Sequence, residues 1–182
     1  MRLGEAVAFI RPSVGPGPGA WADLGAGTGT FTEALAVILG QAGSVVAVDR
    51  DPSVVAVLEQ LAEMDASRAP ITAAQGDIAT VHRIESLRAR EFDGVLLANV
   101  LHYFETPEDV LRNVHGLVKA SGRVVVVEYD RRRANAWVPY PLPFERLRLV
   151  LEMTGFASLE LVNRRSSAFQ GDMYCAVAFK QP

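Results

Sequence analysis

The sequence has one cysteine, few histidines and no long apolar run. Its single cysteine, Cys175, excludes a disulfide within the chain and favours a reducing compartment. No uninterrupted apolar stretch is long enough to span a membrane, and the N-terminal residues make a poor signal peptide. We therefore expect a cytoplasmic protein that is not inserted in a membrane.

An excess of positive charge is also missing. The formal net charge is −3, which argues against nucleic acid as a partner held by bulk electrostatics. The three histidines have no cysteine or carboxylate cluster beside them at metal-ligand spacing, so we expect no metal site. The length of 182 residues, of which 49% are hydrophobic, suits one globular domain over residues 1–182.

A glycine turn organises the N-terminal half of the sequence. The apolar residues 20–24 predict a strand, and Gly25, Gly27 and Gly29 follow on alternate positions. Glycine permits positive φ and lets another molecule approach the backbone closely. Apolar residues then recur at helical spacing up to Leu39, and a helix that begins at such a turn suits an anionic group.

This turn lacks the third glycine of the dinucleotide fingerprint G-x-G-x-x-G. A fingerprint that starts at Gly25 would have Thr30 in place of the third glycine, and one that starts at Gly27 would have Thr32, so neither register fits. The pattern that is present is D-x-G-x-G-x-G, and it begins at Asp23. A turn without any ligand is the alternative, because an isolated glycine motif is weak evidence.

Strands and helices alternate along the rest of the chain. They predict a right-handed, doubly wound, mostly parallel α/β sheet of seven strands, with one antiparallel strand at the C-terminal end. That strand comes from a hairpin, because no helix-length segment separates the last two strands. The predicted strands are residues 20–24, 44–49, 71–75, 92–98, 123–129, 157–162 and 173–180.

Three local predictions concern segments between these strands. Residues 1–19 form a lead-in with a short helix at 5–10, and the Pro and Gly content of 12–19 excludes regular helix there. A short helix is expected within 79–90, and Gly122 is expected to end the helix that begins at Pro107. Residues 130–143 form a long loop that we interpret as a lid.

Carboxylates stand at or just after the ends of the first three strands. Asp23, Asp49 and Asp77 each have a simple structural explanation, such as satisfying turn amides. The carboxyl ends of parallel strands meet at one edge of a sheet, where ligands of this fold class bind. Asp49 also lies about twenty residues beyond the glycine turn, where a carboxylate can accept hydrogen bonds from ribose hydroxyls. Together they indicate one adenosine-containing ligand.

The sequence resembles the class I S-adenosylmethionine-dependent methyltransferases, a Rossmann-like family. The resemblance extends over most of the chain and rests on residues 23–29, 46–49, 75–77, 92–103 and 117–124. It implies that the glycines pack against the methionine and ribose parts of the cofactor, with Asp23 near the amino group. It also implies that Asp49 holds the ribose and that Asp77 and the Ile78 amide recognise the adenine. The cofactor residues that it implies are Asp23, Gly25, Ala26, Gly27, Thr28, Gly29, Asp49, Arg50, Gly76, Asp77, Ile78, Asn99, Val100 and Leu101.

The acceptor side is less clearly marked. His102 is the best candidate for a general base because its ordinary pKa lies near neutrality, although it could instead cap a turn or pack beneath the cofactor. Arginines at 131–133 would hold an acidic acceptor, unless they form a solvated loop. The candidate catalytic residues are His102, Tyr103 and Glu128, and the candidate substrate-binding residues are Tyr129, Arg131, Arg132, Arg133 and Tyr140.

The expected reaction is transfer of the methyl group of S-adenosylmethionine to a small-molecule acceptor by in-line displacement, which leaves S-adenosylhomocysteine. Alignment of the acceptor can supply much of the acceleration, so a general base is optional. The alternatives are a nucleic-acid or protein methyltransferase and a non-catalytic cofactor-binding protein. Residues 99–102 do not match the Asn/Asp-Pro-Pro-aromatic signature of base amino-methylating enzymes. Because the connections are short, the pocket is either open or completed by a second subunit of a homo-oligomer.

Overall fold

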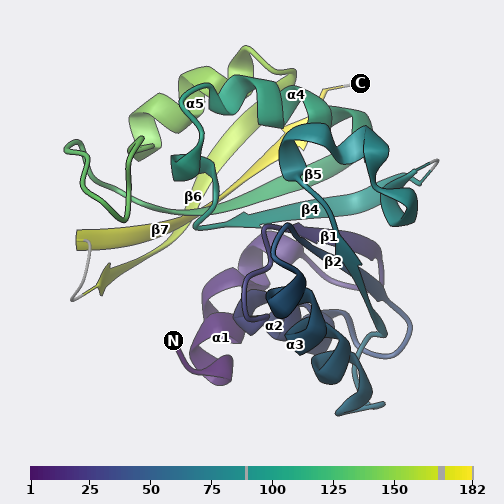
Figure 1. Cartoon of the computed structure of the whole chain (residues 1–182). Coiled ribbons are helices and arrows are strands. Elements are labelled where there is room, and N and C mark those ends of the chain that lie inside the picture. The colour runs from purple at the N-terminus through teal and green to yellow at the C-terminus, as the bar shows by residue number, and fades with distance from the viewer. Residues whose placement is uncertain (89, 168–170, 182) are drawn as a thin grey trace.

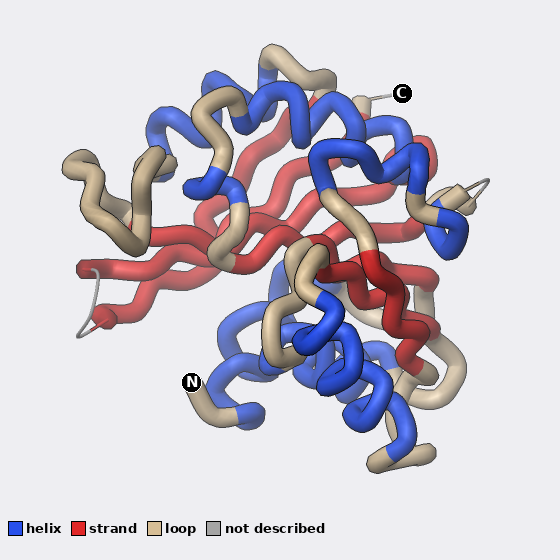
Figure 2. The backbone as a smooth tube through the Cα atoms, viewed as in Figure 1, coloured by secondary structure: helices blue, strands red, loops and turns tan. Residues whose placement is uncertain are grey.

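A seven-stranded sheet runs through the centre of the protein, and helices cover both of its faces (Figures 1 and 2). The computed structural model describes residues 1–88, 90–167 and 171–181. The strand order is β3-β2-β1-β4-β5-β7-β6. The strands are β1 (Ala20–Leu24), β2 (Ser44–Asp49), β3 (Ile71–Gln75), β4 (Phe92–Ala98), β5 (Val118–Tyr129), β6 (Phe156–Ser167) and β7 (Gly171–Lys180).

The predicted fold class is confirmed. Strands β1 to β5 pair in parallel, and β7 is antiparallel to both β5 and β6. The last two strands form the predicted hairpin, and both are longer than expected. This arrangement brings the carboxyl ends of β1 to β5 to one edge of the sheet.

Helices form one layer on each side of the sheet (Figure 1). One layer holds α1 (Leu3–Val14), α2 (Thr30–Leu39) and α3 (Pro52–Glu63), and the other holds α4 (Pro107–Leu117) and α5 (Phe144–Glu152). The alternating side chains of β5 contribute to both layers: Val124 and Val126 pack on the α4 side, and Val125 and Val127 on the α1 side. Two apolar cores therefore hold the sheet from opposite faces.

The N-terminal segment is more helical than predicted. Helix α1 runs to Val14 with Pro12 inside it, so the prediction that residues 12–19 are not helical was wrong for residues 12–14. Ser13 and Val14 are buried against the rest of the protein. This burial offsets the hydrogen bond that Pro12 cannot donate, and the helix ends soon after the proline.

The segment before the long part of β5 also differs from the prediction. Helix α4 ends at Leu117, and Val118 already pairs with Phe92 of β4, so Gly122 does not end the helix. A bulge follows, after which Arg123 pairs with Gly94. The bulge requires a residue without a side chain at Gly122, because a Cβ there would lie 3.0 Å from the Lys119 carbonyl oxygen.

The short helix predicted within residues 79–90 is of the 3₁₀ type in the described part of this segment, which excludes Ala89. Two 3₁₀ helices occupy it, at Ile78–Arg83 and Glu85–Leu87. The buried side chains of Val81 and Leu87 anchor these helices to the core. Among the described residues, no helix combines the length and apolar character needed to cross a membrane.

Candidate active site

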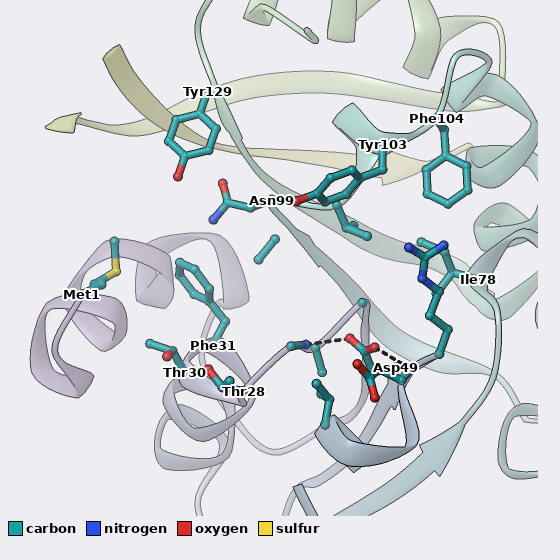
Figure 3. A pocket seen from close by; sticks show the side chains of 18 of the residues that line it. Met1, Thr28, Thr30, Phe31, Asp49, Ile78, Asn99, Tyr103, Phe104 and Tyr129 are labelled. Atoms are coloured by element: carbon teal, nitrogen blue, oxygen red, sulfur yellow. Dashed lines mark hydrogen bonds between the residues drawn. The ribbon is translucent and has the colours of Figure 1, made fainter. Parts of the chain in front are cut away.

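A cavity of about 1020 Å³ opens at the sheet edge where the parallel strands end. Its walls come from the glycine turn after β1, the ends of β2 to β5, the 3₁₀ turn at Leu101–Tyr103, the start of α2, and the β6–β7 hairpin. Figure 3 shows the side chains around it: Asp49 and Ile78 lie toward one end, and Tyr129, Phe31 and Met1 toward the other. A volume of this size accommodates a small-molecule ligand.

Only glycine fits at the start of the turn. Gly25 has φ +78°, and a Cβ on it would lie 2.4 Å from Cγ2 of Val100. The amides of Gly25 and Ala26 both donate to the Val48 carbonyl at 2.9 Å, which ties the turn to the neighbouring strand. Gly29 has φ +86° and is the N-cap residue of α2. The turn is therefore held in one shape, with its backbone facing the cavity.

Asp49 connects the turn to the end of β2. Its Oδ2 accepts a hydrogen bond from the Gly27 amide at 2.9 Å, and its Oδ1 accepts one from the Asp51 amide at 3.0 Å (Figure 3). The carboxylate lines the cavity and retains lone pairs for a ligand hydroxyl. Asp77, at the end of β3, accepts a hydrogen bond from the Ala79 amide at 2.8 Å and also lines the cavity.

Two buried acceptor oxygens near the turn have no hydrogen-bond partner among the described residues. They are Oδ1 of Asp23 and Oδ1 of Asn99. Asp23 is fully buried and accepts a hydrogen bond from Thr32 Oγ1 at 2.6 Å, and burial, with the nearby charge of Asp49, raises its pKa to about 7. Asn99 has φ +55° and lines the cavity.

The oxygen of Asn99, which is a lining residue, favours a ligand that carries N–H donors. The ammonium of the methionyl part of S-adenosylmethionine is such a group, so the residues present fit this cofactor.

His102 and Glu128 form a buried pair beside the cavity. His102 Nδ1 lies 2.7 Å from Glu128 Oε2, and its backbone amide donates to Oε1 of the same carboxylate at 3.2 Å. Glu128 Oε2 also accepts a hydrogen bond from the Tyr129 amide at 3.3 Å. The ring centroid of His102 lies 4.3 Å from that of Tyr103 and 6.1 Å from that of Tyr129. Both tyrosines line the cavity, whereas His102 and Glu128 do not.

Most of the predicted cofactor residues line this one cavity. Asp23, Gly29 and Leu101 do not: Asp23 and Leu101 are fully buried, and a Cβ on Gly29 would meet Leu61. The predicted cofactor residues that line it are Gly25, Ala26, Gly27, Thr28, Asp49, Arg50, Gly76, Asp77, Ile78, Asn99 and Val100.

The predicted substrate residues are not brought together. Tyr129 lines the cavity, but Tyr140 and the arginines do not. The Tyr140 amide donates to the His102 carbonyl at 3.0 Å, and Arg131 Nε donates to the Arg133 carbonyl at 2.8 Å. Arg132 is exposed on the same loop.

Several lining residues were not predicted. Phe31 follows the glycine turn closely, and its position in the first turn of α2 could have indicated it. No motif marked Arg165 and Ser166, which reach the cavity from β6. The others are Met1, Thr30, Asp51, Val54, Ala98, Phe104 and Met173. Over residues 1–88, 90–167 and 171–181, no group of three or more His, Cys, Asp or Glu residues could hold a metal ion.

Comparisons with solved structures show the same fold. CrArsM, an arsenic(III) S-adenosylmethionine methyltransferase from Chlamydomonas reinhardtii, is 18% identical with a TM-score of 0.75, over 99% of this chain and 73% of that chain. Magnesium protoporphyrin IX methyltransferase (ChlM) from Synechocystis PCC 6803, with bound S-adenosylmethionine, is 19% identical with a TM-score of 0.71, over 98% and 78%. The YcgJ protein from Bacillus subtilis is 11% identical with a TM-score of 0.76, over 98% and 99%.

No curated protein matches the sequence. A family model described as "Methyltransferase domain", however, matches residues 22–126, which is more than half of the chain. The match covers the glycine turn, Asp49, Asp77 and Asn99, which surround the cavity. The chain therefore belongs to the methyltransferase domain family, and it is an S-adenosylmethionine-dependent methyltransferase of class I.

Proposed function

We propose that this methyltransferase acts on a small molecule. The observation that carries the proposal is the cavity of about 1020 Å³, in which the residues implied for the cofactor share one space with an aromatic wall. An acceptor that reaches the methyl donor inside this space must be compact or present a narrow end. Two similar proteins, named for arsenic(III) and magnesium protoporphyrin IX, support this choice, as does the net charge of −3.

S-adenosylmethionine, when bound, supplies a methyl group that is activated on a sulfonium. We assign the ribose hydroxyls to Asp49, whose two amide hydrogen bonds hold the carboxylate in place. Asp77 and the backbone of Ile78 bind the adenine, and the unpartnered oxygen of Asn99 accepts from the methionyl ammonium. These residues fix the donor, so that catalysis depends on how the acceptor is aligned.

His102 is buried and does not line the cavity, so we assign it a positioning role behind Tyr103 rather than the role of a base that touches the acceptor. A carboxylate only accepts hydrogen bonds, so the 2.7 Å contact of His102 with Glu128 places the hydrogen on Nδ1 and leaves Nε2 as a hydrogen-bond acceptor. Tyr103 and Tyr129, whose rings lie beside that of His102, line the cavity. Glu128 is then a positioning residue that fixes the histidine tautomer.

Labelled S-adenosylmethionine added with a cell extract tests the proposal. The extract is divided into small-molecule, protein and nucleic-acid fractions, and each is offered to the enzyme and to Asp49→Ala as an inactive control. We expect enzyme-dependent label in the small-molecule fraction alone. Label confined to protein or nucleic acid would refute the proposal. A homo-oligomer and a cytoplasmic location stay predictions, which the molar mass in solution and microscopy of the tagged protein would test.

A further inference from the structure

Charge is unevenly distributed over the cavity wall. Four charged lining residues lie at or just after the ends of β2 and β3, at the end that also holds the glycine turn. They are Asp49, Arg50, Asp51 and Asp77. Among the described lining residues, the other end has a single charged side chain, Arg165 of β6. A ligand part near this end therefore meets the guanidinium of Arg165 and the N-terminal ammonium of Met1.

The guanidinium of Arg165 has one acidic neighbour among the described residues. Nη1 of Arg165 lies 3.6 Å from Oε2 of Glu5, which is longer than a hydrogen bond, and half of the Glu5 side chain is exposed. The same Oε2 accepts a 2.9 Å hydrogen bond from the Arg2 amide, which is the main reason that the pKa of Glu5 is lowered. Because a guanidinium carries five N–H donors, this contact leaves donors for a second anion.

The walls near Arg165 are aromatic or contain sulfur. Phe31 and Tyr129 face the cavity from opposite sides, with Met1 beside Phe31 (Figure 3). Met173, which is paired with Arg165 across the hairpin, lines the same end. Ring faces and thioethers pack well on a flat aromatic molecule. This end combines a surface for an aromatic ring with a planar donor group for a carboxylate.

We propose that the acceptor is an aromatic carboxylate and that Arg165 binds its carboxylate group. This inference rests on the proposed small-molecule function and specifies the substrate class. It differs from the expectation that arginines 131–133 hold an acidic acceptor, since those residues do not line the cavity. A guanidinium pairs with a carboxylate through two parallel hydrogen bonds, and this orients the ring as well as binding it.

The test is calorimetric titration of the protein saturated with S-adenosylhomocysteine. The probes are salicylate, 4-hydroxybenzoate and 4-hydroxycinnamate, each with its neutral amide. We expect at least one acid to bind about tenfold or more tightly than its amide, which is typical of a hydrogen-bonded charge pair. Arg165→Ala should remove this preference for the acid. The matched control is Arg164→Ala, because Arg164 is the adjacent arginine and pairs with Asp130 at 2.8 Å outside the lining.

Three results would overturn the inference. The first is equal binding of acids and amides, or no binding of any probe. The second is an acid preference that survives in Arg165→Ala. The third is a loss of S-adenosylhomocysteine affinity in Arg165→Ala, which would assign the guanidinium to the carboxylate of the cofactor instead.

A failure of this inference can be distinguished from a failure of the proposed small-molecule function by the labelling experiment. If neutral small molecules are methylated, the proposed function stands and only the aromatic carboxylate is wrong. If label enters protein or nucleic acid alone, both are wrong.

Discussion

The two ends of the cavity are built in different ways. The glycine-turn end uses backbone groups and strand-end carboxylates, such as the Gly27 amide on Asp49, from segments close to the motif that marks them. The hairpin end uses side chains from the two extremes of the chain, Met1 and Arg165, with Met173. A common donor needs a constant geometry, whereas acceptors differ between enzymes. The first end therefore carries the family pattern, and the second carries what is particular to this protein.

The buried carboxylates near the two ends of the cavity differ in how completely they are hydrogen-bonded. Asp23, below the glycine turn, has one side-chain donor, Thr32, and an Oδ1 with no partner among the described residues. Glu128, near the hairpin, accepts from His102 Nδ1 and from two backbone amides. An unsatisfied buried carboxylate costs stability, while a fully bonded one contributes to it. We therefore expect opposite effects when the two carboxylates are replaced.

The largest effect should come from Asp23→Asn, which should change how the free energy of unfolding depends on pH. Burial raises the native pKa of Asp23 to about 7 from 3.8, so between these pH values the native state binds a proton that the unfolded state releases. Stability from this group is complete below about pH 4 and is lost as the pH rises to about 7, by up to about 4 kcal/mol.

Urea unfolding of the cofactor-free protein from pH 4.5 to 8 measures this effect. The free energy of unfolding of the wild type minus that of Asp23→Asn should fall with pH up to about 7 and then level off. The contributions of the other titrating groups to the free energy of unfolding cancel in this difference. A flat difference would show that Asp23 titrates normally and is better satisfied than its contacts indicate.

Glu128→Ala should lower the free energy of unfolding by about 3 kcal/mol. It removes the acceptor for His102 Nδ1 and leaves the amides of His102 and Tyr129 without their side-chain acceptor. Glu128→Gln keeps an acceptor oxygen and should cost less than half as much. Affinity for S-adenosylmethionine should change by less than about twofold, because the pair lies outside the cavity lining. A large loss of cofactor affinity would mean that the two ends are not independent.

The same contrast explains what could be predicted from the sequence. Gly25, Asp49 and Asp77 were identified because strand ends in a parallel sheet meet at one edge, whatever the other contacts are. Arg165 was not identified, because the predicted strand ended at residue 162, whereas β6 runs to Ser167 and its register against β7 shifts between Ala157 and Glu160 and again between Leu161 and Asn163. Each shift changes which side chains face the cavity, so simple alternation does not reveal them.

The local errors have a related cause. Pro12 and Gly122 are helix-ending residues by intrinsic preference, and both predictions depended on that preference. Burial of Ser13 and Val14 extends α1 past the proline, and pairing of Val118 with Phe92 ends α4 before the glycine. Tertiary contacts decided both boundaries, and a single sequence does not show which contacts form.

Gly25→Ala should weaken S-adenosylmethionine binding by roughly tenfold to a hundredfold, the equivalent of about 1–3 kcal/mol of backbone strain. The new Cβ would meet Val100 at 2.4 Å, and φ is +78°. Gly17→Ala is the matched control: φ is +91°, but a Cβ there meets nothing within 4 Å, and Gly17 is not a lining residue. Calorimetry should show normal affinity in the control. Equal losses in both variants would point to general destabilisation rather than to the shape of the turn.

The smallest effect should be the change in acceptor binding caused by Glu5→Gln, at the hairpin end of the cavity. Glu5 competes with an incoming carboxylate for Arg165. The pair is partly exposed and its charges are 3.6 Å apart, so removal of the Glu5 charge should strengthen 4-hydroxybenzoate binding by at most about fivefold. The amide oxygen of Gln can still accept from the Arg2 amide, which preserves the start of α1. Added salt should reduce the gain, since exposed charges are screened. Glu145→Gln, which alters a similar exposed pair with Arg148 on α5, should leave binding unchanged. If Glu5→Gln weakened binding instead, Glu5 would itself contact the acceptor, and the hairpin end would recognise a cation as well as an anion.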